Sequence, residues 1–150
     1  MIMLSACLAG VDCRYDGGHN LRPHYKQLWQ DGRAILVCPE SLGGLCIPRP
    51  PAEITGGDGH DVLAGHARVK NRQGTDITEA FLHGAEKVLQ LAKKHRVTAA
   101  LLKERSPSCG ATRIYDGTFS GATRYGMGVT AALLQQNGIA VYSEENHPEL

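Results

Sequence analysis

Four short apolar segments recur along the chain, and their aliphatic residues are nearly continuous. They occupy residues 2–6, 33–38, 97–104 and 139–144, and the second stops where Pro39 follows Cys38. Segments with helical or turn-rich patterns separate them. Strands of this kind, alternating with helices, are typical of a parallel sheet covered on both faces. We therefore predict an α/β fold: a single three-layer domain over residues 1–150, with a mostly parallel, Rossmann-like sheet of about four strands.

The helical segments differ in the strength of their patterns. The clearest begins where Asp76 and Glu79 have the spacing of a capping box. Its apolar residues share one face, and they are Phe81, Ala85, Val88, Leu89 and Ala92. Shorter helices are expected over residues 23–29 and 128–138. Residues 61–78 predict a small β-hairpin, whereas residues 41–57 and 113–121 are rich in turn-forming residues.

Charge and hydropathy exclude some classes of function. The formal net charge is +1, so the chain lacks the basic excess typical of proteins that bind nucleic acid. No apolar run is long enough to span a bilayer. The apolar N-terminus lacks the positive flank and the length of a signal peptide. We therefore expect a cytoplasmic protein without a membrane partner.

The five cysteines are unevenly placed relative to the predicted strands. An odd number of cysteines without a secretion signal argues against a disulfide framework. Cys7, Cys38 and Cys109 each follow the end of a different predicted strand, whereas Cys13 and Cys46 lie further out in loops. Ligands of open parallel sheets bind at the carboxyl ends of the strands. The sequence therefore predicts that Cys7, Cys38 and Cys109 meet at one site.

Three thiolates at one site suit a soft metal, which includes zinc, copper(I) and iron–sulfur clusters. The chain has no C-x-x-C pair of the kind that structural zinc sites use. Among these options, a [4Fe–4S] cluster held by three cysteines is of most interest, because its fourth iron would be open to a substrate.

Polar residues close to these cysteines are candidates for chemistry and for substrate binding. Glu40, Asp16 and Ser106 are the catalytic candidates, since a carboxylate beside an open iron can activate water. Ser108 and Arg49 are the substrate-binding candidates. Each also has an ordinary structural explanation: an Asx turn for Asp16, a turn for the serines, a solvated charge for Glu40 and an ion pair for Arg49.

Several stretches together resemble a small bacterial family that was long without an assigned function. They are SACLAGVDCRYDGGHN, VCPESLGGLCIPRPPAEI, KERSPSCG, IYDGTFSG and GVTAALLQQNGI, in this order and over almost the whole chain. Some members of that family are thiouracil desulfidases.

The resemblance implies an oxygen-sensitive [4Fe–4S] cluster whose three ligands match Cys7, Cys38 and Cys109. It also implies a catalytic carboxylate and hydroxyl, which match Glu40 and Ser106. The implied reaction is non-redox: a small thiolated uracil, such as 2-thiouracil, and water give uracil and hydrogen sulfide. Cys13 and Cys46 depart from the usual pattern, and either is a possible fourth ligand.

Two other functions remain open at this point. A cysteine-nucleophile hydrolase or transferase would use Cys109, and it would need a nearby base that lowers the pKa of the thiol. A metal- or RNA-binding module without catalysis would have thiolated tRNA as its natural partner. The aromatic content of 5% disfavours binding of single strands by stacking.

Overall fold

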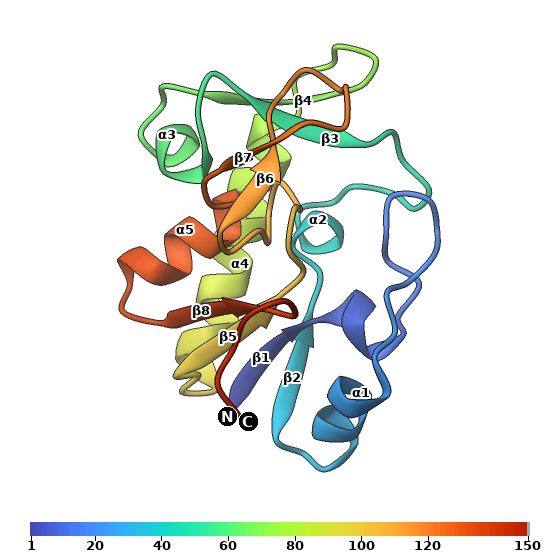
Figure 1. The fold of residues 1–150 in the computed structure, drawn as a ribbon. Coiled ribbons are helices and arrows are strands. Elements are labelled where there is room, and N and C mark those ends of the chain that lie inside the picture. The colour runs from blue at the N-terminus through green and yellow to red at the C-terminus, as the bar shows by residue number, and fades with distance from the viewer. Residues whose placement is uncertain (150) are drawn as a thin grey trace.

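A four-stranded parallel sheet with the strand order β2-β1-β5-β8 forms the centre of the fold (Figure 1). The computed structural model describes residues 1–149, and Leu150, the last residue of the predicted domain, lies outside the described residues. The strands are β1 (Ile2–Ser5), β2 (Ala34–Val37), β5 (Ala99–Leu102) and β8 (Ala140–Ser143). Each lies within a predicted apolar segment, so the predicted α/β sheet is confirmed.

The strand order creates a crevice beside the central strand β1. The chain passes from β1 to β2 on one side, then crosses over to β5 on the other side. The connections on the two sides of β1 therefore lead away from each other. At such a reversal the loops after the strands separate, and ligands bind in the gap at the carboxyl ends.

Helices cover both faces of the sheet, as predicted. Helix α1 (Pro23–Gln30) lies on one face, and α4 (Thr78–Lys94) and α5 (Val129–Gln136) lie on the other (Figure 1). Successive residues of β1 point to opposite faces: Met3 belongs to the larger core under α4 and α5, and Leu4 to the smaller core under α1. Both faces are apolar, which explains why the strands show continuous rather than alternating apolar patterns.

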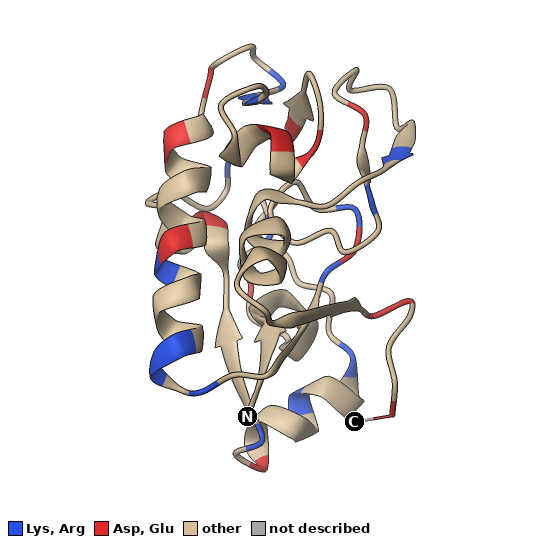
Figure 2. Ribbon diagram, turned by 90° about the vertical axis from the view of Figure 1, so that its left-hand side faces the viewer, with Lys and Arg blue, Asp and Glu red and all other residues tan. Residues whose placement is uncertain are grey.

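Helix α4 begins later than its capping-box spacing predicts. Ile77 is the N-cap residue, and no side chain caps the helix from that position. The Asp76 carboxylate instead accepts a hydrogen bond from the Thr78 N–H and pairs with Arg68 at 2.8 Å. Basic residues at its last turn suit the helix dipole (Figure 2). No helix of the described chain is both long enough and apolar enough to cross a membrane.

The smaller elements lie beyond the carboxyl ends of the sheet (Figure 1). Residue 38 is followed directly by the short helix α2 (Pro39–Leu42), and β1 leads into the 3-10 helix η1 (Ala6–Ala9). Two antiparallel strand pairs lie on this side: β3 (Ala52–Thr55) with β4 (Arg68–Asn71), and β6 (Arg113–Tyr115) with β7 (Thr123–Tyr125).

The predicted hairpin over residues 61–78 is only half right. Its second part is β4, but the partner β3 comes from the segment expected to be a loop. In the sequence, helix α3 (Gly59–Leu63) lies between β3 and β4, which are neighbours in the sheet. Asp58 starts this helix because its carboxylate accepts the N–H groups of His60 and Asp61, which are otherwise unpaired at a helix start.

Candidate active site

A cavity of about 440 Å³ opens at the carboxyl ends of β1, β2 and β5. Its volume lies in the range that small-molecule sites have. Four of the five cysteines line it, and they are Cys7, Cys13, Cys38 and Cys109. Of the predicted polar residues, Glu40, Ser106 and Arg49 line it as well. The topological crevice and the predicted residues therefore coincide.

Short elements that start directly at the strand ends carry Cys7 and Cys38. Cys7 lies in η1, and the Asn20 amide is 3.5 Å from its sulfur. Cys38 is the N-cap residue of α2, where Pro39 occupies the first helical position and ends the strand ladder. Neither residue takes part in a disulfide. Both thiols are therefore available to a metal at this edge.

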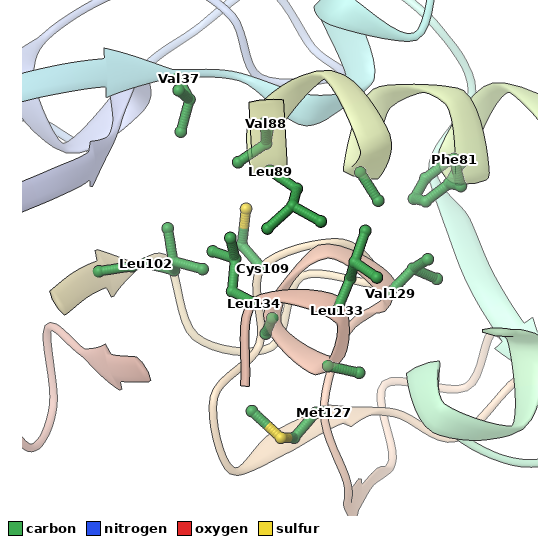
Figure 3. Close-up of a cluster of buried hydrophobic side chains, with 14 of the residues drawn as sticks. Val37, Phe81, Val88, Leu89, Leu102, Cys109, Met127, Val129, Leu133 and Leu134 are labelled. Atoms are coloured by element: carbon green, nitrogen blue, oxygen red, sulfur yellow. The ribbon is translucent and has the colours of Figure 1, made fainter. Parts of the chain in front are cut away.

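The Cys109 side chain is the most deeply enclosed of the three predicted ligands. It is 4% exposed, and its sulfur lies among the apolar side chains of the larger core (Figure 3). Burial raises the pKa of the Cys109 thiol well above its ordinary value, and the negative charge of Glu40 adds to this. Without a metal, Cys109 is therefore a neutral thiol.

Cys13 lines the cavity together with Cys7 and Cys38, and the Cys38 thiol donates to the Cys13 carbonyl oxygen at 3.7 Å. A hydrogen bond from the Cys13 thiol lowers the pKa of Cys38 to about 6, and the same group lowers the pKa of Cys7. The pKa of Cys13 is raised in return. Cys7, Cys13 and Cys38 are therefore three thiols on the same side of the cavity, and the thiolate is the form that binds metal. Cys46 is exposed and does not line the cavity.

The thiols suit a cluster better than a single ion. Within residues 1–149, no three His, Cys, Asp or Glu side chains lie close enough together to hold one metal ion. The ligands of a single zinc ion all converge on one centre, whereas each cysteine of an iron–sulfur cluster binds its own iron. Three separate thiols around one cavity of this volume fit an iron–sulfur cluster.

Glu40 enters the cavity from the first turn of α2. Helix α2 packs closely against α4, and the contact depends on Gly84: a Cβ there would lie 2.0 Å from the Pro39 carbonyl oxygen. One carboxylate oxygen of Glu40, Oε1, accepts a hydrogen bond from Ser108 Oγ at 2.7 Å. The other, Oε2, lies 3.9 Å from Cys38 Sγ. The carboxylate is therefore held beside a predicted cluster ligand.

The two predicted serines have different positions. Ser106 lines the cavity, and its Oγ accepts the backbone N–H groups of Ser108 and Cys109 at 3.2 and 3.1 Å. Ser108 is 0% exposed and does not line the cavity. Its hydroxyl lies 3.0 Å from that of Ser106 and reaches Glu40 on the other side. The structure thus places Ser108 behind the cavity wall.

The start of helix α5 fixes the other side of this loop. The backbone N–H groups of Val129 and Ala131 donate to the carbonyls of Pro107 and Ser108. Gly128 allows the close approach, because a Cβ there would lie 2.4 Å from the Ser108 carbonyl carbon. The free N–H groups of a helix start are therefore used to hold the loop that carries Cys109.

Glu104 is a structural residue of the site that the sequence did not identify. It is 1% exposed, and its Oε1 accepts the backbone N–H groups of Ala111, Thr112 and Arg113 at 2.9 to 3.0 Å. The Thr112 hydroxyl donates to Oε2 at 2.8 Å. A charge directly after an apolar strand gives no sign of burial, since most charged side chains at that place face solvent. Glu104 closes the loop that carries Ser106 and Cys109.

We expect Glu104→Gln to destabilise the cluster-free protein by roughly 1.5–3 kcal/mol at pH 7, the usual contribution of hydrogen bonds to a charged group. Burial would raise the pKa of Glu104, but the N–H donors outweigh it and hold the pKa below the ordinary 4.5. A lowered folded-state pKa stabilises the protein above pH 4.5, and this stabilisation disappears as the pH falls through the folded value.

Urea unfolding at pH 7 and at pH 4 measures this effect. The difference between wild type and Glu104→Gln should be smaller at pH 4. Glu86→Gln, on the exposed face of α4, is the control and should change stability by less than about 0.5 kcal/mol. An equal loss for Glu104→Gln at both pH values would contradict the assignment of a buried, ionised carboxylate.

Asp16 and Arg49 have contacts of their own. Asp16 does not line the cavity: its carboxylate accepts the Gly18 N–H at 2.9 Å and pairs with Arg14 at 3.2 Å. This is the Asx turn that its sequence context also allowed. The Arg49 guanidinium donates to the carbonyls of Cys13 and Cys46 at 3.0 and 3.3 Å, so it joins two loops at the cavity wall.

Comparisons with known proteins agree on one family. The sequence model of the family described as 2-thiouracil desulfurase matches residues 2–146. An uncharacterized protein of Bacillus subtilis (strain 168), YbbK, is 50% identical over 144 residues, which are 96% of this chain and 95% of that protein. The solved structure of the [4Fe-4S]-dependent thiouracil desulfidase TudS is similar with a TM-score of 0.88 and 44% identity. It covers 99% of this chain and 93% of that one.

Proposed function

The chain belongs to the 2-thiouracil desulfurase family, and from this membership we propose that it removes the sulfur of 2-thiouracil or a closely related thiolated uracil. The products are uracil and hydrogen sulfide. The observation that carries the proposal is the cavity at the sheet edge, where three cysteines from separate strand ends lie together with the Glu40 carboxylate. The solved relative TudS depends on a [4Fe–4S] cluster, and the thiols here suit the same group.

Cys7, Cys38 and Cys109 would hold the cluster and leave one iron without a protein ligand. When bound, the cluster supplies a Lewis-acidic iron for the soft thione sulfur. The positions of the three residues support this assignment, because each follows a different strand of the sheet and all line one cavity. Cys13 would remain a free thiol in the cavity wall beside the cluster.

Glu40 would act as the general base. Water adds its oxygen to the ring carbon that carries sulfur, and Glu40 Oε2 accepts the proton that water loses. The carbon–sulfur bond then breaks as the added hydroxyl becomes the carbonyl, and the sulfur leaves as hydrogen sulfide with the proton of that hydroxyl and the proton held by Glu40. Ser106, which lines the cavity, would lie beside the ring of the bound substrate, with its hydroxyl directed to Ser108 Oγ at 3.0 Å. The reaction balances as thione plus water to carbonyl plus hydrogen sulfide, without an oxidant or a reductant.

The geometry disfavours Cys109 as a nucleophile. A nucleophilic cysteine needs a lowered pKa and a base beside it. Here burial raises the pKa of the Cys109 thiol, and Ser108 Oγ, at 3.5 Å, is its hydrogen-bond neighbour. A role as a cluster ligand is compatible with both features, since metal binding itself displaces the thiol proton.

The proposed substrate is a free small molecule, and the proposed compartment is the cytoplasm. The cavity volume supports a small-molecule substrate, because it suits a ligand of one or two rings rather than a nucleic-acid strand. All five cysteines are free, which suits a reducing compartment.

The experiment that tests the function is an anaerobic assay of sulfide release. The protein is reconstituted with iron and sulfide, desalted, and mixed with 2-thiouracil or with thiolated tRNA. We expect release from the free base by the reconstituted protein and none by the cluster-free protein. Release from thiolated tRNA alone would overturn the proposed substrate, and release from neither would overturn the proposed function.

A further inference from the structure

The hydroxyl of Ser108 connects two of the polar residues that line the cavity, Glu40 and Ser106. It lies 2.7 Å from Glu40 Oε1 and 3.0 Å from Ser106 Oγ, and the Ser108 side chain is itself 0% exposed. Glu40 and Ser106 come from elements far apart in the sequence, α2 and the loop after β5. Among their contacts, Ser108 is the group that both share.

Counting donors and acceptors fixes the direction of these hydrogen bonds. A hydroxyl has one proton to donate and two lone pairs that accept. The backbone N–H groups of Ser108 and Cys109 both donate to Ser106 Oγ. Its lone pairs are therefore used, and it donates its own proton to Ser108 Oγ. Ser108 then has its proton left for Glu40, whose ionised carboxylate can only accept. The order is Ser106 to Ser108 to Glu40.

This order leaves the two oxygens of Glu40 in different environments. Oε1 is occupied by the buried Ser108 hydroxyl, whereas Oε2 faces Cys38 Sγ at 3.9 Å. A carboxylate without the Ser108 bond could turn about its terminal torsion, which is broad in glutamate. A base is effective only when one of its oxygens stays within hydrogen-bond reach of the proton it takes.

We propose that Ser108 is a positioning residue, whose hydroxyl holds Glu40 Oε1 so that Oε2 stays turned towards the cavity as the basic oxygen. The proposal rests on the proposed function of the cavity. It gives Ser108 no contact with the substrate, in contrast to the substrate-binding role that its place in the sequence suggested. Because Ser106 donates to Ser108, part of the effect of Ser106 passes through the same bond.

The kinetic test combines Ser108→Ala with the removal of Glu40. In the wild-type background, Ser108→Ala should lower kcat roughly 10- to 100-fold, the loss expected for a hydrogen bond to a charged group, while KM stays the same. In the Glu40→Ala background, the same change should lower kcat by less than about twofold, because Ser108 then has no carboxylate to hold and the two effects are not additive. Iron and sulfide content per chain is measured for every variant.

The matched control removes a different buried hydroxyl. Thr130, on α5, is 0% exposed, and its Oγ1 has no hydrogen-bond partner among the described residues. Thr130→Val should therefore keep the wild-type kcat. An unchanged kcat in Ser108→Ala would overturn the proposal. The proposal would also be overturned if Ser108→Ala lowered kcat equally with and without Glu40, or if the loss of kcat followed the iron content. Either result would indicate that Ser108 has a structural role around Cys109.

A second measurement needs neither the cluster nor turnover. In the cluster-free protein, Ser108→Ala should lower the unfolding midpoint by about 3 to 10 °C, and by no more than half as much in the Glu40→Ala background. Equal shifts in both backgrounds would overturn the proposed bond. If the reconstituted wild type releases no sulfide, the proposed function fails, and this second measurement still decides whether Ser108 holds Glu40.

Discussion

Replacement of Cys7, Cys38 or Cys109 by alanine is expected to abolish cluster binding, with iron and sulfide contents near zero after anaerobic reconstitution. Each of the three follows a different strand of the parallel sheet, and all line the same cavity. A cluster that loses one of three protein ligands keeps two, and thiolate ligation is what holds iron–sulfur clusters in proteins. Sulfide release from 2-thiouracil should disappear together with the iron.

Cys13→Ala and Cys46→Ala are the matched controls. Cys46 is exposed outside the cavity, so it should be neutral. Cys13 is the sharper control because it is 6% exposed and lines the cavity together with Cys7 and Cys38. We expect Cys13→Ala to keep the cluster. Loss of iron in Cys13→Ala would mean that Cys13 is the fourth ligand, and the proposed open iron would then be wrong.

Glu40→Gln is expected to separate chemistry from cluster binding. The amide keeps the shape of the side chain and can still accept the hydrogen bond from Ser108, but it cannot accept a proton from water. General base catalysis contributes about 10²- to 10⁴-fold, so turnover per intact cluster should fall by that order. The iron content should remain that of the wild type, because Glu40 lies beside Cys38 without being a proposed ligand.

Ser106→Ala should show a smaller loss, roughly 10-fold, since its hydroxyl donates a hydrogen bond rather than taking the proton. Asp16→Asn should have no effect on turnover, because its carboxylate is used in an Asx turn and an ion pair outside the cavity. Turnover per cluster that is unchanged in Glu40→Gln would exclude the carboxylate as the base.

The sheet was predictable because its strands are covered on both faces. Met3 and Leu4 pack into different cores, which makes the strand continuously apolar and recognisable without a partner. Strand β3 and the β6–β7 pair were not predicted, because β3 and β6 lie in segments rich in turn-forming residues, whose composition resembles that of loops. Their place in the fold depends on distant residues: buried Glu53 of β3 accepts the backbone N–H of Gly117, 64 residues further along the chain.

The candidate site, like the fold, was predictable only in part. A general rule of parallel sheets brought Cys7, Cys38 and Cys109 to one edge, and the cavity agrees with that prediction. The contact between Ser108 and Glu40 spans 68 residues and depends on how α2 and the loop after β5 pack together. No local pattern encodes such a contact. Burial of Glu104 likewise depends on the path of the loop around it, so its role emerged only from the structure.

One anaerobic reaction in ¹⁸O-labelled water, without an added reductant, tests the central claim most directly. Reconstituted protein is incubated with 2-thiouracil, and sulfide, uracil and the label in uracil are measured in the same sample. Hydrolytic desulfuration predicts equal amounts of sulfide and uracil, with one ¹⁸O atom in each uracil formed. Sulfide without labelled uracil, or no product from a protein that contains the full cluster, would contradict the account.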